Sequence, residues 1–313
     1  MSDTNTTAKA LTERWGPERR REFIDFRLQW DGKINRAELV DHFGISTQQA
    51  SADLARYSEL SPDNLSYDKS AKVYRAAPTF RPLSAASDAR HYLGQLVDMA
   101  SGTASRAGSF IGWVPPCDVI HYPTRPVGSH TLLKLLWAIR DGEEIRVTYQ
   151  SMRRPSPSAI WIAPHAFGSD GLRWHVRAWS HEEGEFGDFV LSRIHTVTDA
   201  RKTAVDPGVD GLWFGYVDVV ILPRNGLTPD QRRAVEIDYG MKKGRLVINC
   251  RKALVWYVLR QLHLDQPGAP SVLEQPLEYE NTPELQGLIS AARKQPEPDL
   301  LTPIQKESSI CLT

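Results

Sequence analysis

The spacing of apolar residues predicts two short helices near the start of the chain. Residues 18–30 mix apolar and charged side chains in a pattern that indicates an amphipathic helix, which begins near Pro17 and ends before Gly32. Residues 36–43 carry an apolar stripe directly after Asn35, a residue type that caps helix N-termini. Two helices therefore follow one another closely in this part of the sequence.

The tripeptide Gly-Ile-Ser at residues 44–46 separates the second helix from a third one. A glycine permits a left-handed turn, Ile45 can fill the angle between two helices, and Ser46 can cap the next helix. The third helix, residues 47–60, turns its apolar residues inward at three- and four-residue spacing. Its start leaves small or polar side chains pointing outward, namely Thr47, Gln48, Gln49, Ser51 and Ala52.

A two-stranded hairpin is predicted over residues 65–76, which alternate around an Asp-Lys-Ser turn. Together, the helices, the glycine turn and this wing match a winged helix-turn-helix. Gln and Thr side chains suit the reading of base edges, because Gln can form a bidentate pair with adenine. The alternative is an ordinary three-helix bundle with a solvated polar face. The candidate DNA-binding residues are Arg19, Arg20, Arg21, Arg36, Ser46, Thr47, Gln48, Gln49, Ser51, Arg56, Tyr67, Lys69, Lys72 and Arg75, of which the basic ones and Tyr67 would contact phosphates.

The middle of the chain combines one helix with several short strands. Apolar residues at helical spacing predict a helix over residues 129–142. Alternation of apolar and polar residues predicts strands within 143–152, 159–167 and 172–180, and residues 184–200 supply one or two more. Short strands joined by tight turns indicate a small, strongly bent sheet or barrel.

Two proline-bearing segments, residues 77–90 and 113–127, indicate a boundary region around a predicted helix at residues 91–100. Residues 216–264 then show strand, helix, strand and helix, which is typical of an α+β unit. We therefore expect an α+β protein of several domains. The expected parts are a winged helix-turn-helix at 1–80, a helical and proline-rich linker at 81–128, a β domain at 129–205, a C-terminal extension at 206–295 and a tail at 296–313.

One predicted strand carries an unusual concentration of basic side chains. Alternation places Arg173, His175 and Arg177 on one face, and Trp174 and Val176 on the other. The basic side chains repel one another unless something anionic or strongly hydrated lies opposite. Either this face is an exposed sheet edge, or it forms a basic pocket for a nucleotide, an oligonucleotide or another phosphate compound, because guanidinium groups suit phosphate. The residues that could complete such a pocket are His165 and Arg193.

Four consecutive motifs in this region, TYQSM, IAPHAF, DGLRWHVRAW and DFVLSRI, resemble the WYL domain of bacterial transcription regulators. The Trp-Tyr-Leu triplet that names the family appears here as Trp-His-Val at residues 174–176, and the surrounding spacing is kept through residues 189–194. The resemblance implies an Sm-like β-barrel with a ligand pocket of basic and polar residues. The positions that match the pocket are Tyr149, Ser151, His165, His175, Arg177 and Arg193, and Arg173 shares the strand face of His175.

Roughly residues 15–290 resemble the subgroup of WYL regulators found with bacterial phage-defence systems of the BREX and CBASS kind. Members of that subgroup have a winged helix-turn-helix, a WYL domain and a C-terminal extension, and they act as dimeric repressors. The resemblance implies a homodimer. Because one recognition helix covers too few base pairs for useful specificity, we expect this dimer to bind an inverted-repeat operator in double-stranded DNA. The resemblance also implies repression of a defence operon, and from the basic strand face we expect a nucleotide-like or nucleic-acid ligand to modulate DNA binding.

Composition limits the other possibilities. The 313 residues fit two or three domains, and 38 basic residues balance 38 acidic ones, so any DNA contact must come from local clustering of basic groups. No apolar stretch approaches the roughly 20 residues that cross a bilayer, and the first ten residues are too polar for a secretory signal. The three cysteines lie far apart in no metal-ligand spacing. We therefore expect a cytoplasmic protein with no membrane partner, no metal and no cofactor.

Two other classes of protein compete with a DNA-binding regulator. An enzyme finds little support, because the sequence carries no phosphate-binding loop, serine-hydrolase or metalloprotease motif, and we expect no catalytic residues. A protein that binds RNA or single strands is the stronger alternative, since small barrels with aromatic and basic residues serve that role. Duplex gel shifts against single-strand competitors separate this alternative from a duplex-binding regulator.

Overall fold

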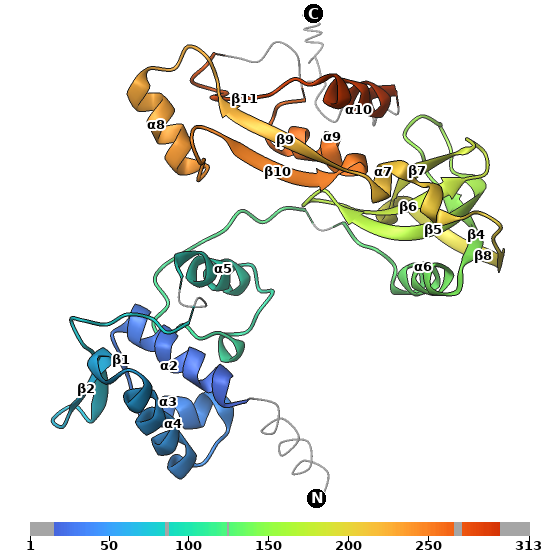
Figure 1. Cartoon of the computed structure of the whole chain (residues 1–313). Coiled ribbons are helices and arrows are strands. Elements are labelled where there is room, and N and C mark those ends of the chain that lie inside the picture. Colours follow the sequence, from blue (N-terminus) through green and yellow to red (C-terminus); the bar gives the residue numbers. More distant parts are fainter. Residues whose placement is uncertain (1–15, 85–87, 124, 266–270, 295–313) are drawn as a thin grey trace, which may run out of the picture. The chain divides into compact units, whose positions relative to one another are not determined.

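The chain folds into two compact units, Met1–Tyr122 and Pro123–Thr313 (Figure 1). The computed structural model describes residues 16–84, 88–123, 125–265 and 271–294. The N-terminal unit has one apolar core, and the second unit has two, one in the five-stranded sheet region and one in the C-terminal extension. Among the described residues, no helix combines the length and apolarity needed to cross a membrane.

The N-terminal unit contains the predicted helices and hairpin. Its first two helices each end at a glycine in the left-handed region, Gly32 with φ 69° and Gly44 with φ 66°. The Asn35 side chain accepts a hydrogen bond from the backbone of Glu38, and the Glu38 side chain accepts one from the backbone of Asn35, which together form a capping box. Ser46 accepts a hydrogen bond from the backbone of the third helix. The predicted start and stop signals are thereby confirmed. The elements are α2 (Pro17–Asp31), β1 (Lys33–Ile34), α3 (Arg36–Phe43), α4 (Thr47–Leu60), β2 (Leu65–Asp68) and β3 (Val73–Ala76), with the strands in the order β1-β3-β2.

The segment that we expected to be a linker, residues 81–128, supplies part of the N-terminal core. Helix α5 (Ala89–Ala100) buries Leu96 against this core, and Phe110 is only 1% exposed. The Phe110 ring meets the Phe23 ring edge-on with centroids 5.2 Å apart. Apolar burial, which composition alone does not reveal, therefore extends the N-terminal unit well past residue 80.

The second unit begins with helix α6 and an antiparallel five-stranded sheet in the order β7-β6-β5-β4-β8. A single 3₁₀ turn, Leu191–Arg193, joins the two edge strands, which requires the sheet to bend strongly. Register shifts within β5–β6 and β4–β8 assist this bend. The small, strongly bent sheet predicted from the sequence is present. The elements are α6 (Ser129–Asp141), β4 (Glu143–Tyr149), β5 (Ser158–Ser169), β6 (Trp174–Ser180), β7 (Glu185–Val190) and β8 (Ile194–Lys202).

The remainder of the second unit is the predicted α+β extension. A three-stranded sheet in the order β10-β9-β11 buries Val219 and Ile221 against apolar residues of the surrounding helices, including Leu259 and Leu285. The strand-helix-strand-helix prediction is confirmed, and the structure adds a short strand and a final helix. The elements are α7 (Gly211–Phe214), β9 (Tyr216–Pro223), α8 (Pro229–Asp238), β10 (Leu246–Arg251), α9 (Val255–Gln261), β11 (Leu277–Tyr279) and α10 (Pro283–Lys294).

Candidate nucleic-acid interface and ligand pocket

Helix α4 has the two faces that a recognition helix needs. Its inner face anchors the helix in the core through Ala50, Leu54 and Tyr57, each at most 1% exposed. Its first turn is exposed and polar, with Gln48 and Gln49 directly after the cap. Because the N-terminal residues of a recognition helix are those that reach base edges, this turn is the candidate reading surface. The predicted residues on it are Ser46, Thr47, Gln48, Gln49 and, half-buried beside them, Ser51.

The structure places Arg20 differently from the expectation that it would face phosphate. Its side chain is 9% exposed, and its Nε lies 2.6 Å from a carboxylate oxygen of Asp53 on α4. This ion pair joins α2 to α4 and leaves the Arg20 guanidinium directed inward. Periodicity could not reveal this pairing, because Asp53 follows Arg20 by 33 residues.

The other predicted basic contacts of the helices remain nearer the surface. Arg36 is exposed and donates to the Ser51 hydroxyl at 3.3 Å, while Arg56 is exposed on α4. Arg19 forms an ion pair with Glu22 and lies 4.2 Å above the Phe110 ring. Arg36 and Arg56 are therefore better placed to reach a phosphate than Arg20.

The wing between β2 and β3 presents its charged tip to solvent. Asp68 orders the turn by accepting hydrogen bonds from the backbone of Ser70 and Ala71, both at 3.0 Å. The Ala71 hydrogen bond and the neighbouring Arg75 lower the pKa of Asp68, so this carboxylate keeps its charge to a lower pH than a free aspartate does. Lys72 has φ 54°, which directs the chain back into β3. The predicted wing residues Tyr67, Lys69 and Lys72 are all exposed.

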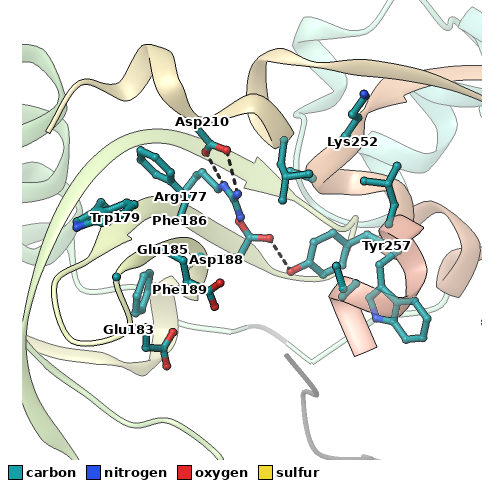
Figure 2. A pocket seen from close by; sticks show the side chains of 18 of the residues that line it. Arg177, Trp179, Glu183, Glu185, Phe186, Asp188, Phe189, Asp210, Lys252 and Tyr257 are labelled. Carbon is teal, nitrogen blue, oxygen red and sulfur yellow. Dashed lines mark hydrogen bonds and ion pairs between the residues drawn. The ribbon is translucent and has the colours of Figure 1, made fainter. Parts of the chain in front are cut away.

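A cavity of about 710 Å³ opens in the second unit, between the bent sheet and the C-terminal extension (Figure 2). Of the predicted ligand residues, Tyr149, Ser151, Arg177 and Arg193 line it. The aromatic side chains of Trp179, Phe186 and Tyr257 line it as well. The remaining predicted residues, His165, Arg173 and His175, are not part of its lining.

Arg177 lies between two carboxylates of its own chain, as Figure 2 shows. Its Nε and Nη2 donate to Asp210 at 2.8 and 3.1 Å, and its Nη1 donates to Asp188 at 3.3 Å. Asp210 also contacts His165 Nε2 at 3.0 Å and accepts from the backbone of Trp213 at the start of α7. Sequence reasoning missed Asp210, whose only signal was its position before a short helical run.

The other two basic residues of this stretch, Arg173 just before β6 and His175 within it, are also buried. Arg173 is 5% exposed and donates to Asp170 at 2.9 Å. His175 stacks on Tyr257 with ring centroids 5.0 Å apart, and the Tyr257 hydroxyl donates to Asp188 at 3.1 Å. The alternative of an exposed sheet edge is therefore wrong, because β6 lies between β5 and β7 and carboxylates of the same chain lie opposite this face.

The charges of this network follow from its contacts. Burial alone would raise the pKa of Asp210, but the hydrogen bond and charge of Arg177 outweigh it and lower the pKa below its ordinary value. Burial lowers the pKa of His165 more than Asp210 raises it, so His165 is neutral at pH 7. Since a carboxylate only accepts, the neutral imidazole carries its proton on Nε2. The network therefore holds one cation between two anions.

Three family descriptions match successive parts of the chain. Residues 16–98 match the BrxR transcriptional regulator winged helix-turn-helix domain, residues 130–199 match the WYL domain, and residues 216–285 match the BrxR C-terminal dimerization domain. These matches confirm the expected winged helix-turn-helix and WYL regulator architecture.

Curated relatives match over nearly the whole length. The DNA-binding transcriptional repressor CapW of Stenotrophomonas maltophilia is 43% identical over 274 residues, which cover 87% of this chain and 92% of the relative. The chain belongs to the CapW family of DNA-binding transcriptional repressors. The CapW protein of Escherichia coli strain KTE188 is 41% identical, and the match covers 88% of this chain and 93% of the relative. The CapW protein of Pseudomonas aeruginosa is 40% identical, and the match covers 92% of this chain and 97% of the relative.

Solved structures give a weaker likeness than the CapW relatives. The proteasome accessory factor B/C (PafBC) of Arthrobacter aurescens covers 83% of this chain and 46% of its own at 16% identity, with a TM-score of 0.24. Such a score is too low to show a shared fold. Membership of the CapW family therefore stands on sequence identity and on the three domain matches.

Proposed function

We propose that this protein is a dimeric, sequence-specific repressor that binds double-stranded DNA. The observation that carries the proposal is the first turn of α4, where exposed Gln48 and Gln49 stand on a helix whose opposite face is buried. The wing supplies Lys69 and Lys72 for phosphate contacts beside that helix. A helix of this kind reads base edges in the major groove while basic side chains fix its register.

The proposed operator is an inverted repeat. One recognition helix covers too few base pairs for useful specificity, so two-fold pairing of chains is expected. The match of residues 216–285 to a dimerization domain supports this pairing. The regulated genes are proposed to be those of a phage-defence operon, as the resemblance to the subgroup of WYL regulators found with such systems implies.

We also propose that an anionic, nucleotide-like or nucleic-acid ligand enters the cavity and changes DNA binding. Aromatic rings such as Trp179 and Phe186 offer surfaces for a base, and Arg193 offers a cation. A phosphate that approaches Arg177 competes with Asp188 and Asp210, which hold that guanidinium at present. Binding would therefore rearrange the contacts between the sheet and the C-terminal extension.

Footprinting on the DNA upstream of the gene, together with light scattering of the purified protein, tests the repressor. We expect a dimer that protects two symmetric half-sites, and duplex binding that single-stranded or RNA competitors do not displace. A monomer that protects one short asymmetric site would contradict the proposal. Displacement by single strands would favour the alternative of a single-strand-binding protein.

A thermal-shift screen with nucleotides, cyclic nucleotides and short oligonucleotides tests the ligand. We expect at least one of these probes to stabilise the parent protein and Arg146→Ala, whose side chain is exposed on β4 outside the cavity, but not Arg193→Ala. A probe that stabilises all three equally would place its site elsewhere.

A further inference from the structure

The two glutamines in the first turn of α4 have different surroundings. Gln49 donates from Nε2 to a carboxylate oxygen of Asp53, one helical turn later, at 3.0 Å. The side chain of Gln48 is exposed and makes no hydrogen bond within the part of the chain that the structure describes. The amide of Gln49 is thus held by the protein, whereas that of Gln48 is free to turn.

The carboxylate that holds Gln49 is itself fixed. Arg20 donates to both oxygens of Asp53, at 2.6 and 3.2 Å, and each of these two side chains is 9% exposed. An ionised carboxylate accepts hydrogen bonds and donates none. The nitrogen of the Gln49 amide, and not its oxygen, must therefore face Asp53, so the orientation of this amide is determined by chemistry.

We propose that Gln49 is a specificity-determining residue that presents its Oε1 as an acceptor and selects adenine or cytosine on the contacted strand. Both bases carry an exocyclic amine in the major groove, whereas guanine and thymine offer only acceptors there. Where Oε1 meets the base edge, an acceptor opposite it leaves both without a hydrogen bond, which is costly once water is excluded. The Nε2 hydrogen that Asp53 does not take lies beside Oε1 and cannot replace it at that position. Asp53 and Arg20 act as positioning residues, and the inference rests on the proposed duplex binding.

The test measures base preference with the full-length protein and single-base variants of the footprinted operator. At one position in each half-site, the parent protein should prefer adenine or cytosine over guanine or thymine by about fivefold or more, the worth of one hydrogen bond. Gln49→Ala should reduce this preference to within about twofold and leave other positions unchanged. Gln48→Ala is the matched control, and it should retain the preference at this position.

Asp53→Asn tests the positioning role. An asparagine amide can donate or accept, so the amide of Gln49 can turn, and guanine or thymine should then be tolerated at the same position. Because each preference is a ratio between DNA sequences for one protein sample, partial loss of folded protein does not alter it. In the double variant Gln49→Glu with Asp53→Asn, the new carboxylate can only accept, so the preference for adenine or cytosine should return.

Three results would overturn the inference: a preference for guanine or thymine at the position that Gln49→Ala affects, no affected position, or an unchanged profile for Asp53→Asn. A parent protein that binds no duplex in a sequence-specific way would instead contradict the proposed function. The two failures are thus distinguishable, because the inference can fail while operator binding persists.

Discussion

At the scale of single residues, Arg177 is paired with carboxylates of its own chain, whereas the sequence suggested a basic face without such partners. Arg177 and Asp210 have side chains that are 4% and 2% exposed, so their ion pair is shielded from water. Removing one member of such a buried pair leaves the other charge without compensation, which is more damaging than losing a surface pair. The contribution of Arg177 to stability must therefore be separated from any role in ligand binding.

Arg177→Ala should lower the free energy of unfolding by about 3–5 kcal/mol, because Asp210 and Asp188 then remain largely buried without their cation. Chemical denaturation monitored by circular dichroism measures this loss. Arg146→Ala, an exposed substitution on the neighbouring sheet surface, is the control and should change stability by no more than about 0.5 kcal/mol. Equal effects of the two substitutions would contradict the buried network.

His165 makes stability depend on pH in a direction set by its lowered pKa. Burial is the larger cause, and it keeps the folded imidazole neutral at pH values where the unfolded chain, with a pKa near 6.5, takes up a proton. Stability should therefore fall as the pH drops below about 6.5. The melting temperature of the parent protein should therefore fall between pH 7.5 and pH 5.5. In His165→Gln, whose amide can still donate to Asp210, this fall should be smaller.

His195→Gln is the matched control for this pH series, because His195 is exposed on β8. Part of the pH dependence should survive in His165→Gln, since burial also lowers the pKa of His42 in the N-terminal unit. A steeper loss of melting temperature in His165→Gln than in the parent protein would reverse the assigned sign.

At the scale of elements, the sequence predicted those features that local spacing determines. The helices at α2, α3 and α4 followed from apolar periodicity and from caps such as Asn35 and Ser46. The pairing of Arg20 with Asp53 and of Arg177 with Asp210 could not be predicted, since each carboxylate lies 33 residues away along the chain. Pairing at that separation depends on how helices and strands pack, which periodicity does not contain.

The proposed roles of α4 in base contacts and of the wing in phosphate contacts predict different effects of substitutions. Gln48→Ala should weaken binding to the operator by about 1–3 kcal/mol, because a base contact is lost. It should change binding to random DNA only slightly. Lys72→Ala should weaken both DNAs similarly and reduce the slope of log affinity against log salt by about one unit. Salt-dependent fluorescence anisotropy on both DNAs measures this. If Gln48→Ala affects random DNA as strongly as operator, α4 is not the reading helix.

The packing of Phe110 predicts that the N-terminal unit needs chain beyond residue 80. Phe110→Ala should destabilise this unit by about 3–5 kcal/mol, because a side chain that is 1% exposed is removed from the core. Both the melting temperature and the affinity for the operator should fall. Tyr122→Ala is the matched control, since Tyr122 is 64% exposed, and it should leave both nearly unchanged.

At the scale of the whole molecule, the proposed inverted-repeat operator requires two chains to present their recognition helices to one face of the duplex. Half-sites should therefore be separated by about one helical turn or a whole multiple of it. Inserting about five base pairs between them rotates one half-site to the opposite face and should reduce affinity to that of a single half-site. Inserting about ten base pairs should restore much of the binding if the dimer can span that distance.

Gel shifts with this spacing series measure the phase dependence. Affinity that declines smoothly with every inserted base pair, without recovery at a full turn, would contradict two-fold binding. A ligand that couples to such a dimer should change operator affinity by about 5- to 150-fold, the usual range of allosteric coupling. That change requires unequal ligand affinity for the DNA-competent and DNA-incompetent states.

The burial of Phe110 and Ile111 also bears on where the chain can be cut. Asp31 accepts hydrogen bonds from the backbone of Gly112 at 3.2 Å and Trp113 at 3.1 Å, so the protected stretch reaches Trp113. A protease requires local unfolding to cleave such a stretch, but not to cleave the mostly exposed residues 117–122. Limited digestion should therefore spare residues 109–113 and cut on either side of them, within the exposed residues 101–108 or 117–122, and a gene fragment that stops at residue 80 should yield an insoluble product.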